Sequence, residues 1–337
     1  MNETVRRGLG GTVAFAAVVA LLLHVVTDPH LAQWISNLAY VGGSAGGAWL
    51  AFGGARRRRG TARHAWRAIG AGQLSWLVAN AIWGVHESIL GEHLPVPSVF
   101  DVFYGLAMLL VLVGVTLLVA PQLRAASPAR TVLDVLLVAA SGFYVAWVTL
   151  LRDLPELGWS AERAVTWLYP TFDVALACVA VIGLSRATRN DRVRWSMLAV
   201  GVLGMSAADG VWAYANLHGM FESGSTLDAL WLAAYLVIGL AARTDIDDRP
   251  DAEHGAVSER WTALVPCVPV LLVIAGAALS HGPADSVRLV AGLAVFVLLC
   301  VRQVVAVLEN QRLARDLECR VAVRTAELGQ SEALLRA

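Results

Sequence analysis

Ten apolar runs dominate the sequence, and each has the length and composition of a helix that crosses a lipid bilayer. A membrane-spanning helix needs about 20 mostly apolar residues. The chain has 337 residues, of which 57% are hydrophobic and only 15% are charged. We therefore expect an all-α integral membrane protein with ten transmembrane helices. The predicted spans are residues 9–27, 34–54, 66–89, 97–119, 130–151, 163–185, 194–216, 226–243, 262–280 and 286–308.

The basic residues predict how these spans are oriented. All 26 of them are arginine, and short cytoplasmic loops carry an excess of basic residues. With the N-terminus inside, every arginine except Arg152, Arg163 and Arg288 falls on the cytoplasmic side. The segment "ARRRRGTARHAWR" alone would fix the connection between spans two and three. We therefore expect both termini in the cytoplasm. A formal net charge of zero gives no reason to expect a nucleic-acid partner.

The first four spans, within residues 1–119, resemble the next four, within 130–243. An offset of 129 residues, which becomes 127 after a shorter loop, aligns polar, aromatic and small residues. Copies with an even number of spans are parallel and related by an axis along the membrane normal. A linker at 244–261, spans nine and ten within 262–308, and a terminal helix at 309–337 complete the predicted division. The aligned pairs are Tyr40–Tyr169, Trp66–Trp195, Gly72–Gly201, Ala79–Ala208, Trp83–Trp212, Ser98–Ser225, Asp101–Asp228, Tyr104–Trp231 and Ala107–Ala234.

Polar side chains inside the predicted spans are candidates for a ligand site, because charges within hydrocarbon are costly and usually face the bundle interior. With nearby aromatic residues they could line outward-facing cavities for a small apolar or cationic ligand. A structural interpretation is also open. Asp101 and Asp228 would favour the positive ends of helix dipoles, and Asn80 and Asp209 would tie helices together. The candidate ligand-binding residues are Asp173, Asp209, Asn80, Asp101, Asp228, Tyr169, Trp83, Trp212 and Trp231.

The segment "HESILGEH" is a candidate metal site on the outer side. His86 and His93 lie seven residues apart with Glu87 between them, and imidazole with carboxylate suits zinc or copper. Gly91 and Pro95 indicate instead that the helix ends before His93, which would leave solvated loop histidines. A haem held by paired histidines is a further alternative, and no other cofactor is expected. The sequence contains no nucleotide-binding, P-loop or zinc-protease motif. A membrane enzyme with outward-facing His and Asp residues stays open as a third class of function.

The terminal helix is predicted to leave the membrane. No proline occurs from Asp285 to Leu335, so a helix of about 75 Å would run some 40 Å past about 30 Å of hydrocarbon. Its apolar residues step by four, four and then seven, which is a heptad seam with a stutter. Such a seam favours a parallel homodimeric coiled coil, and a solvated amphipathic helix on the membrane is the alternative. The seam residues are Leu313, Leu317, Val321, Leu328 and Leu335.

Three short stretches carry a resemblance to a known class of protein. "LECRVAVRTAEL" resembles the linker of bacterial transmembrane signalling proteins, and "GQSEALLRA" resembles the lead-in to a PAS domain. "PSVFDVFY" is similar to segments in the multi-span sensor regions of actinobacterial GGDEF/EAL proteins. The resemblance implies a sensory input module of the bacterial inner membrane that is truncated at residue 337. It also implies that PAS, GGDEF or EAL domains for cyclic di-GMP turnover follow, or a histidine kinase core.

Together these features predict a sensory and dimerising input module. A ligand or lipid from the outer side, or the state of the membrane, would bias the packing of the bundle. Span ten and the coil would then relay that change to a cytoplasmic output domain. The expected partners are a second copy of the chain and membrane lipids. The alternative is a proton-coupled secondary transporter, in which Asp173 and Asp209 would carry the proton at mid-membrane.

Overall fold

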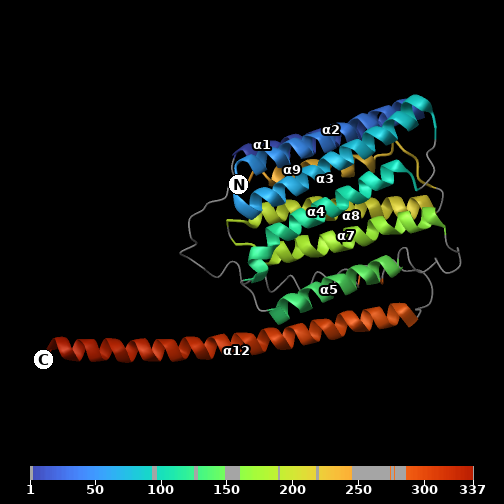
Figure 1. Ribbon diagram of the computed structural model, residues 1–337. Coiled ribbons are helices and arrows are strands. Elements are labelled where there is room, and N and C mark those ends of the chain that lie inside the picture. The colour runs from blue at the N-terminus through green and yellow to red at the C-terminus, as the bar shows by residue number, and fades with distance from the viewer. Residues whose placement is uncertain are drawn as a thin grey trace.

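The computed structural model describes residues 3–92, 97–124, 128–148, 160–188, 190–217, 220–244, 274, 277 and 286–336. Within this part of the chain all regular structure is helical, as predicted, and there is no strand. The helices run alongside one another as an elongated bundle (Figure 1). They are α1 (Glu3–Val25), α2 (Pro29–Arg56), α3 (Gly60–Gly84), the π-helical turn η1 (Val85–Leu90), α4 (Val99–Arg124), α5 (Pro128–Ala146), α7 (Ala161–Ser185), α8 (Arg192–Leu217), α9 (Asp228–Ala241) and α12 (Ser286–Arg336).

Several of these helices have the character of membrane spans. Four are long and apolar enough to cross a bilayer, and three further apolar helices are shorter. The long ones cover Glu3–Val25, Val99–Gln122, Arg192–Asn216 and Ser286–Val321. Helices α2 and α3 are equally long but carry many glycine and polar residues. The predicted ninth span, 262–280, lies outside the described residues except at positions 274 and 277.

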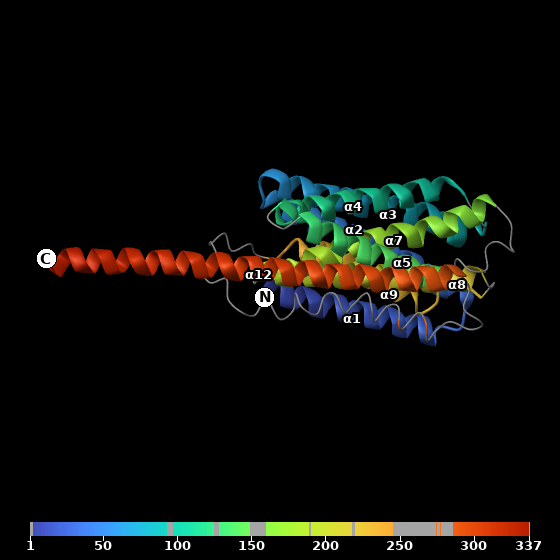
Figure 2. The same cartoon turned by 90° about the horizontal axis from the view of Figure 1, so that it is seen from below.

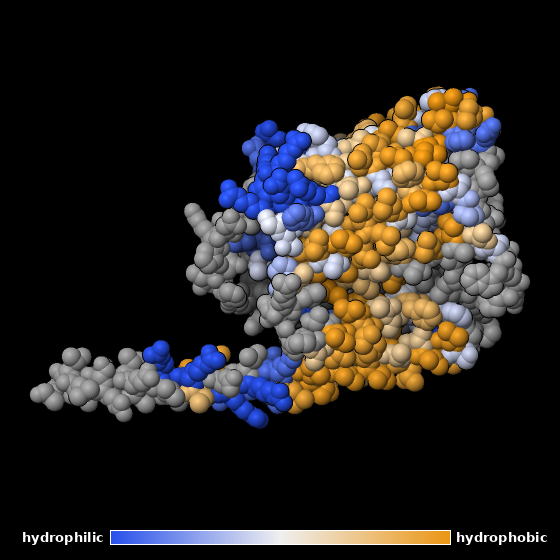
Figure 3. Space-filling view, viewed as in Figure 1, coloured by the Kyte–Doolittle hydropathy of each residue, from blue (hydrophilic) through white to orange (hydrophobic). Residues whose placement is uncertain are grey.

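The outside of the bundle is rich in exposed leucine, valine and phenylalanine. Leu21 of α1 is 62% exposed, Val102 of α4 is 68% exposed and Phe296 of α12 is 62% exposed. A broad hydrophobic area covers the middle of the face seen in Figure 3, and hydrophilic residues gather near the end from which α12 projects. Soluble proteins rarely expose contiguous apolar patches larger than a few hundred Å². This surface is that of a membrane protein.

Six of the helices form a closed ring. Helix α2 contacts α3, α3 contacts α4, α4 contacts α7, α7 contacts α8, α8 contacts α9, and α9 returns to α2. Helix α1 packs outside the ring against α9 and α2, while α5 packs outside against α7. Helix α12 runs along α5, as both views of the ribbon show (Figures 1 and 2). The ring therefore encloses the centre of the bundle, and α12 lies at its periphery.

Helix α2 joins the ring through small residues. Its buried face is made of Gly, Ala and Ser with a single Asn, the kind of surface that lets membrane helices approach closely. A side-chain carbon at Gly239 of α9 would lie 2.5 Å from the carbonyl oxygen of Gly47 and 2.6 Å from its Cα. The two backbones are thus in direct contact, and there is no room for any larger residue at Gly239 without separating α2 from α9.

Two other helix pairs meet at glycines in corresponding positions. A Cβ at Gly72 of α3 would meet Val111 Cγ2 at 2.7 Å and the Ala107 carbonyl oxygen at 2.9 Å. A Cβ at Gly201 of α8 would meet Ile238 Cγ1 at 2.6 Å and the Ala234 carbonyl oxygen at 3.4 Å. The offsets of 129 and 127 residues relate every member of the first contact to its counterpart in the second. The α3–α4 and α8–α9 crossings therefore have the same local construction.

Polar groups fix the two ends of α2. At its start, the Asp28 carboxylate accepts a hydrogen bond of 3.0 Å from the Leu31 backbone N–H, and Pro29 occupies the first turn, as is common at helix N-termini. Just past its end, the buried Arg58 guanidinium donates to the Ala242 and Thr244 carbonyl oxygens at 2.5 and 3.0 Å. Because the last carbonyls of a helix lack partners in the helix itself, Arg58 caps α9 and ties it to α2.

Helix α12 is continuous over 51 residues, which confirms the predicted uninterrupted helix. Its first half packs on α5, and its second half projects away from the bundle (Figures 1 and 2). The projection leaves from the end where the N-terminus and the connection from α2 to α3 lie. Leu317 and Val321 of the predicted seam are 64% and 58% exposed. Leu313, Leu328 and Leu335 lie on the same helix, but their side chains are outside the described part.

Replacing Gly239 with alanine tests the close contact between α2 and α9. We expect Gly239→Ala to lower the free energy of unfolding by about 1–3 kcal/mol, the usual cost of overpacking. The matched control is Gly210→Ala in α8, where a Cβ would meet nothing within 4 Å. Helix propensity alone should favour alanine there by about 0.8–1 kcal/mol. Thermal midpoints in maltoside micelles compare the two, and equal midpoints would contradict direct contact between the backbones.

Candidate ligand cavity

The six-helix ring encloses a cavity of about 190 Å³. Its residues come from α2 and α7, from the early turns of α4 and α9, from the later turns of α3 and α8, and from the connection between α8 and α9. The cavity therefore lies toward the end of the bundle opposite the arginine-rich connection between α2 and α3. It is lined by Tyr40, Trp76, Asn80, Trp83, Phe100, Asp101, Tyr104, Met108, Tyr169, Met205, Asp209, Trp212, Asn216, Phe221, Ser223, Trp231 and Tyr235.

Aromatic rings form most of the cavity wall and hold one another in place. The rings of Tyr40 and Trp231 lie 6.0 Å apart at an angle of 67°. The ring of Tyr169 contacts Tyr104 at 6.0 Å and Trp212 at 5.9 Å, both edge to face. Such edge-to-face pairs are favourable and directional. The wall is therefore a preformed aromatic cage in which each ring is oriented by a neighbour.

Asn80 and Asp209, which the repeat aligns, have matching partners. The Tyr104 hydroxyl donates to Asn80 Oδ1 at 2.6 Å. The Trp231 indole N–H donates to Asp209 Oδ1 at 2.6 Å. Tyr104 and Trp231 are themselves aligned by the repeat. Each half of the cavity thus places one polar side chain at the same depth, and an amide in one half corresponds to a carboxylate in the other.

Asp101 has both a structural contact and a contact at the cavity. Its Oδ2 atom accepts a hydrogen bond of 2.7 Å from the Ser98 backbone N–H at the start of α4. Its Oδ1 atom accepts the Tyr169 hydroxyl at 2.5 Å. One carboxylate oxygen of Asp101 therefore stabilises the start of α4, while the other oxygen belongs to the cavity wall.

Asp228, the counterpart of Asp101, does not line the cavity. Its Oδ2 atom accepts hydrogen bonds from the Ser36 hydroxyl at 2.6 Å and from the Gly224 backbone N–H at 2.9 Å. The cavity residue Tyr40 lies beside it. Asp228 thus ties the start of α9 to α2 and supports the wall from behind.

Asp173 of α7 is buried beside Asp209. It does not line the cavity but lies next to Asp209, which does. In the described part of the chain, neither carboxylate forms an ion pair with a basic side chain. The corresponding position in the first repeat is Ser44, whose hydroxyl donates to the Tyr40 carbonyl of its own helix at 2.6 Å. Only the second repeat therefore has an acid pair at this depth.

Glu87 holds together one end of the cavity. It lies in η1, and its Oε2 atom accepts hydrogen bonds from Asn37 Nδ2 at 2.7 Å, Trp83 Nε1 at 3.0 Å and Ser223 Oγ at 3.1 Å. These donors come from α2, from α3 and from the segment before α9. One carboxylate therefore joins three parts of the chain around the aromatic cage.

The structure gives no metal site at "HESILGEH" within the residues it describes. Gly91, with a φ of 64°, ends η1 in the left-handed conformation that favours glycine. His86 Nδ1 lies 3.5 Å from Glu92 Oε2, and His93 lies outside the described residues. Among those described, no three His, Cys, Asp or Glu side chains are grouped so that they could hold a metal ion.

The cavity also contains residues that were not among the predicted site residues. Two further pairs obey the repeat offsets, namely Trp76 with Met205 and Met108 with Tyr235. Extending the alignment along each span would have identified them. Phe221 and Ser223 belong to the connection between α8 and α9, and the sequence carries no signal for their placement because they lie outside the aligned motifs.

No family model matches this chain, and no curated protein or solved structure is significantly similar to it.

Removing the Glu87 carboxylate tests its role as an anchor. A hydrogen bond to a charged group contributes about 1.5–3 kcal/mol, so Glu87→Ala should lower the free energy of unfolding by at least about 2 kcal/mol. The matched control is Glu92→Ala, because Glu92 is exposed and an exposed ion pair contributes only about 0–1 kcal/mol. Thermal unfolding in micelles measures both variants, and a Glu87→Ala protein as stable as the control would show that the three contacts are dispensable.

Proposed function

We propose that this protein is the membrane-embedded, dimerising sensory module of a bacterial signalling protein. A ligand, a lipid or the state of the membrane is sensed by the ring. Helix α12 relays the change to a cytoplasmic output domain, for which synthesis or hydrolysis of cyclic di-GMP is the best candidate. The observation that carries the proposal is α12 itself. One continuous helix packs on the bundle with its first half and leaves the bundle with its second half.

The proposed topology has ten spans with both termini in the cytoplasm. The N-terminus, the connection containing Arg56, Arg57 and Arg59, and the projecting half of α12 all lie at one end of the bundle (Figure 1). These three arginines are exposed, and an excess of basic residues marks the cytoplasmic side. Helices α2 and α3, with 28 and 25 residues, span about 40 Å at 1.5 Å per residue, which is sufficient to cross the bilayer despite their polar buried faces.

The proposed duplication of the first four spans is supported by the order of helix contacts. Matching α2, α3 and α4 with α7, α8 and α9 relates α2–α3 to α7–α8, α3–α4 to α8–α9 and α2–α9 to α4–α7. The paired glycine crossings and the paired cavity residues follow the same correspondence. A parallel duplication about an axis through the ring accounts for all of these relations.

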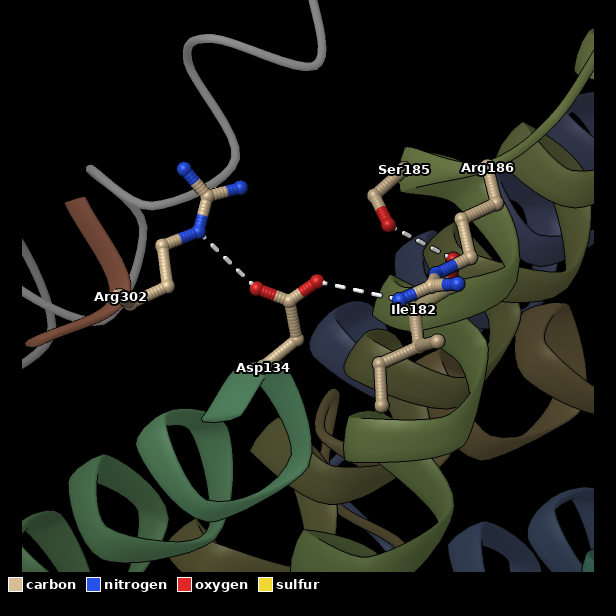
Figure 4. Close-up of polar contacts among 5 residues, drawn as sticks. All are labelled: Asp134, Ile182, Ser185, Arg186 and Arg302. Atoms are coloured by element: carbon tan, nitrogen blue, oxygen red, sulfur yellow. Dashed lines mark hydrogen bonds and ion pairs between the residues drawn. The ribbon is translucent and has the colours of Figure 1, made fainter. Parts of the chain in front are cut away.

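A polar connection joins α12 to the ring. Asp134 of α5 lies between two arginines (Figure 4). Its Oδ1 atom is 3.1 Å from Arg302 Nε on α12, and its Oδ2 atom is 3.4 Å from Arg186 Nη2 at the end of α7. All three side chains are largely buried, so their interactions are screened little by salt. In the proposed mechanism, a movement of α7 shifts Asp134 and thereby the position of α12.

The projecting half of α12 is the proposed dimer contact. Leu317 and Val321 are exposed along one face, and a single helix cannot bury such a seam itself. A parallel two-stranded coil with a second copy would bury it. Because a coiled coil responds to rotation or sliding of its helices, a displacement of α12 in the membrane would alter the register presented to the output domain.

Proton-coupled transport is the second candidate, and the buried pair of Asp173 and Asp209 is the observation that favours it. Acids at mid-membrane are typical of proton relays. A transporter does not require a helix projecting far beyond the membrane, which is why we place it second. Proton flux driven by a substrate gradient in proteoliposomes would favour transport, whereas the sensory proposal predicts no flux.

Acidic substitutions on the seam test the dimer. We expect Leu317→Asp combined with Val321→Asp to convert a dimer into a monomer, because charges on the seam would repel across a parallel coil. The matched control is Cys319→Asp, since residue 319 is exposed and lies about 200° around the helix from either seam residue. Light scattering coupled to size exclusion measures the mass in micelles, and a double variant that stays dimeric would overturn the proposed contact.

A further inference from the structure

The cavity has features that identify the chemical class of its ligand. We propose that it binds a small organic cation, namely an ammonium group that carries apolar substituents. That this ligand is the stimulus rests on the proposed function, whereas its binding is argued from the cavity alone.

The cavity has acidic side chains around it and no basic ones in its lining. The charged residues in its lining are Asp101 and Asp209, with no arginine or histidine among the lining residues. Asp173 lies beside Asp209, and Glu87 accepts hydrogen bonds from the lining residues Trp83 and Ser223. Carboxylates removed from water are costly unless a positive charge compensates them. A cation in the cavity would supply that charge, whereas an anion would be repelled by every acid around it.

The cavity wall distinguishes an organic cation from a metal ion. Aromatic faces attract ammonium groups, and cages of aromatic rings are a general solution for binding quaternary ammonium ligands. Tyr40, Tyr104, Tyr169, Trp212 and Trp231 form such a cage here through their mutual edge-to-face contacts. Divalent metals need several oxygen or nitrogen ligands, and the described residues provide no group of three that could hold one.

The existing hydrogen bonds hold the polar groups ready for a ligand. Asp209 Oδ1 accepts the Trp231 indole N–H and Asp101 Oδ1 accepts the Tyr169 hydroxyl, so both carboxylates are held in place by members of the cage. Asn80 is only 2% exposed, and its Nδ2 atom lies near Tyr235 but makes no hydrogen bond of acceptable geometry to any described residue. A carboxylate held in place and an amide donor facing one cavity suit an ammonium ligand that also carries a hydroxyl or carbonyl oxygen.

The volume limits the ligand to a small molecule. An apolar cavity of about 150 Å³ accommodates benzene, and this one measures about 190 Å³. A ligand of roughly seven to ten non-hydrogen atoms would therefore fill it. Choline has this size, a quaternary ammonium group and a hydroxyl, which makes it a suitable probe for the class.

The test compares choline with its uncharged carbon isostere, 3,3-dimethylbutan-1-ol, on the full chain in maltoside micelles. Binding is followed by the fluorescence of the cavity tryptophans and by calorimetry. We expect saturable binding of choline at one site per chain and binding of the isostere that is at least tenfold weaker. Equal affinity for the two probes would overturn the proposal, and so would the absence of saturable binding by both choline and tetramethylammonium.

Variants locate the binding within the cavity. Asp209→Asn should weaken choline binding at least tenfold, and Asp101→Asn provides a second variant should the first fail to fold. Glu92→Gln, which changes an exposed acid outside the cavity lining, should bind choline like the original protein. Binding unaffected by both aspartate variants would place the cation elsewhere and overturn the assignment.

These experiments test the ligand class and the sensory role separately. If choline and tetramethylammonium fail to bind while the seam variants still abolish the dimer, the ligand class is wrong and the sensory proposal stands. If choline binds at Asp209 and proteoliposomes show a flux of protons or of choline across the membrane, the cation site stands and the sensory role does not.

Discussion

Direct backbone contact between α2 and α9 is the constraint on which the rest of the structure depends. Gly47 and Gly239 let the two helices approach so closely that the last member of the ring meets the first. Helices in lipid gain little from burying apolar side chains, since the lipid is equally apolar, so they associate through close packing of small residues. Many leucines and valines face outward instead. With the ring closed in this way, its interior can hold aromatic and polar side chains that lipid would exclude.

The interior is nearly symmetric, but its two halves differ at two polar positions. Tyr40 and Tyr169, Trp83 and Trp212, and Tyr104 and Trp231 line the same cavity from equivalent helices. The equivalence fails at Asn80 and Asp209, and again at Ser44 and Asp173. Both differences place an aspartic acid in the second half where the first half has an uncharged polar side chain. The lining therefore has an acid from each half, Asp101 and Asp209, but at positions that the offsets do not relate.

Much of the fold was predictable because its signals are local or repeated. The apolar runs predicted an all-helical membrane protein, and the absence of proline after Asp285 predicted the continuous α12. The repeat offsets predicted which aromatic residues correspond, and the ring brings these residues together. Four of the described helices are long and apolar enough to be recognised as spans. Ten spans and a coiled coil are more than these helices establish, so both belong to the proposed function.

The contacts that were not predictable join residues far apart in the sequence. Glu87 reaches Asn37 and Ser223, which are 50 and 136 residues away, so its role as an anchor has no local signature. Asp134 and Arg302 are separated by 168 residues, and nothing in either segment indicates the pairing. Asp173 was grouped with the cavity residues from its depth alone, whereas its position on α7 puts it beside Asp209 and outside the lining. Depth along a helix is readable from sequence, but the direction in which a residue points within a ring of helices is not.

The central claim is that the bundle sets the position of a dimeric α12 through Asp134. The most direct measurement is the distance between spin labels on Cys319 of two copies, with Cys178, Cys267 and Cys300 replaced by serine. Helix axes about 8–10 Å apart, with labels on the outer faces, give an expected distance of about 25–40 Å. The account predicts a distinct distance in this range and a shift in the distribution when Asp134 is replaced by asparagine. The absence of any defined distance, or identical distributions with and without the Asp134 carboxylate, would contradict it.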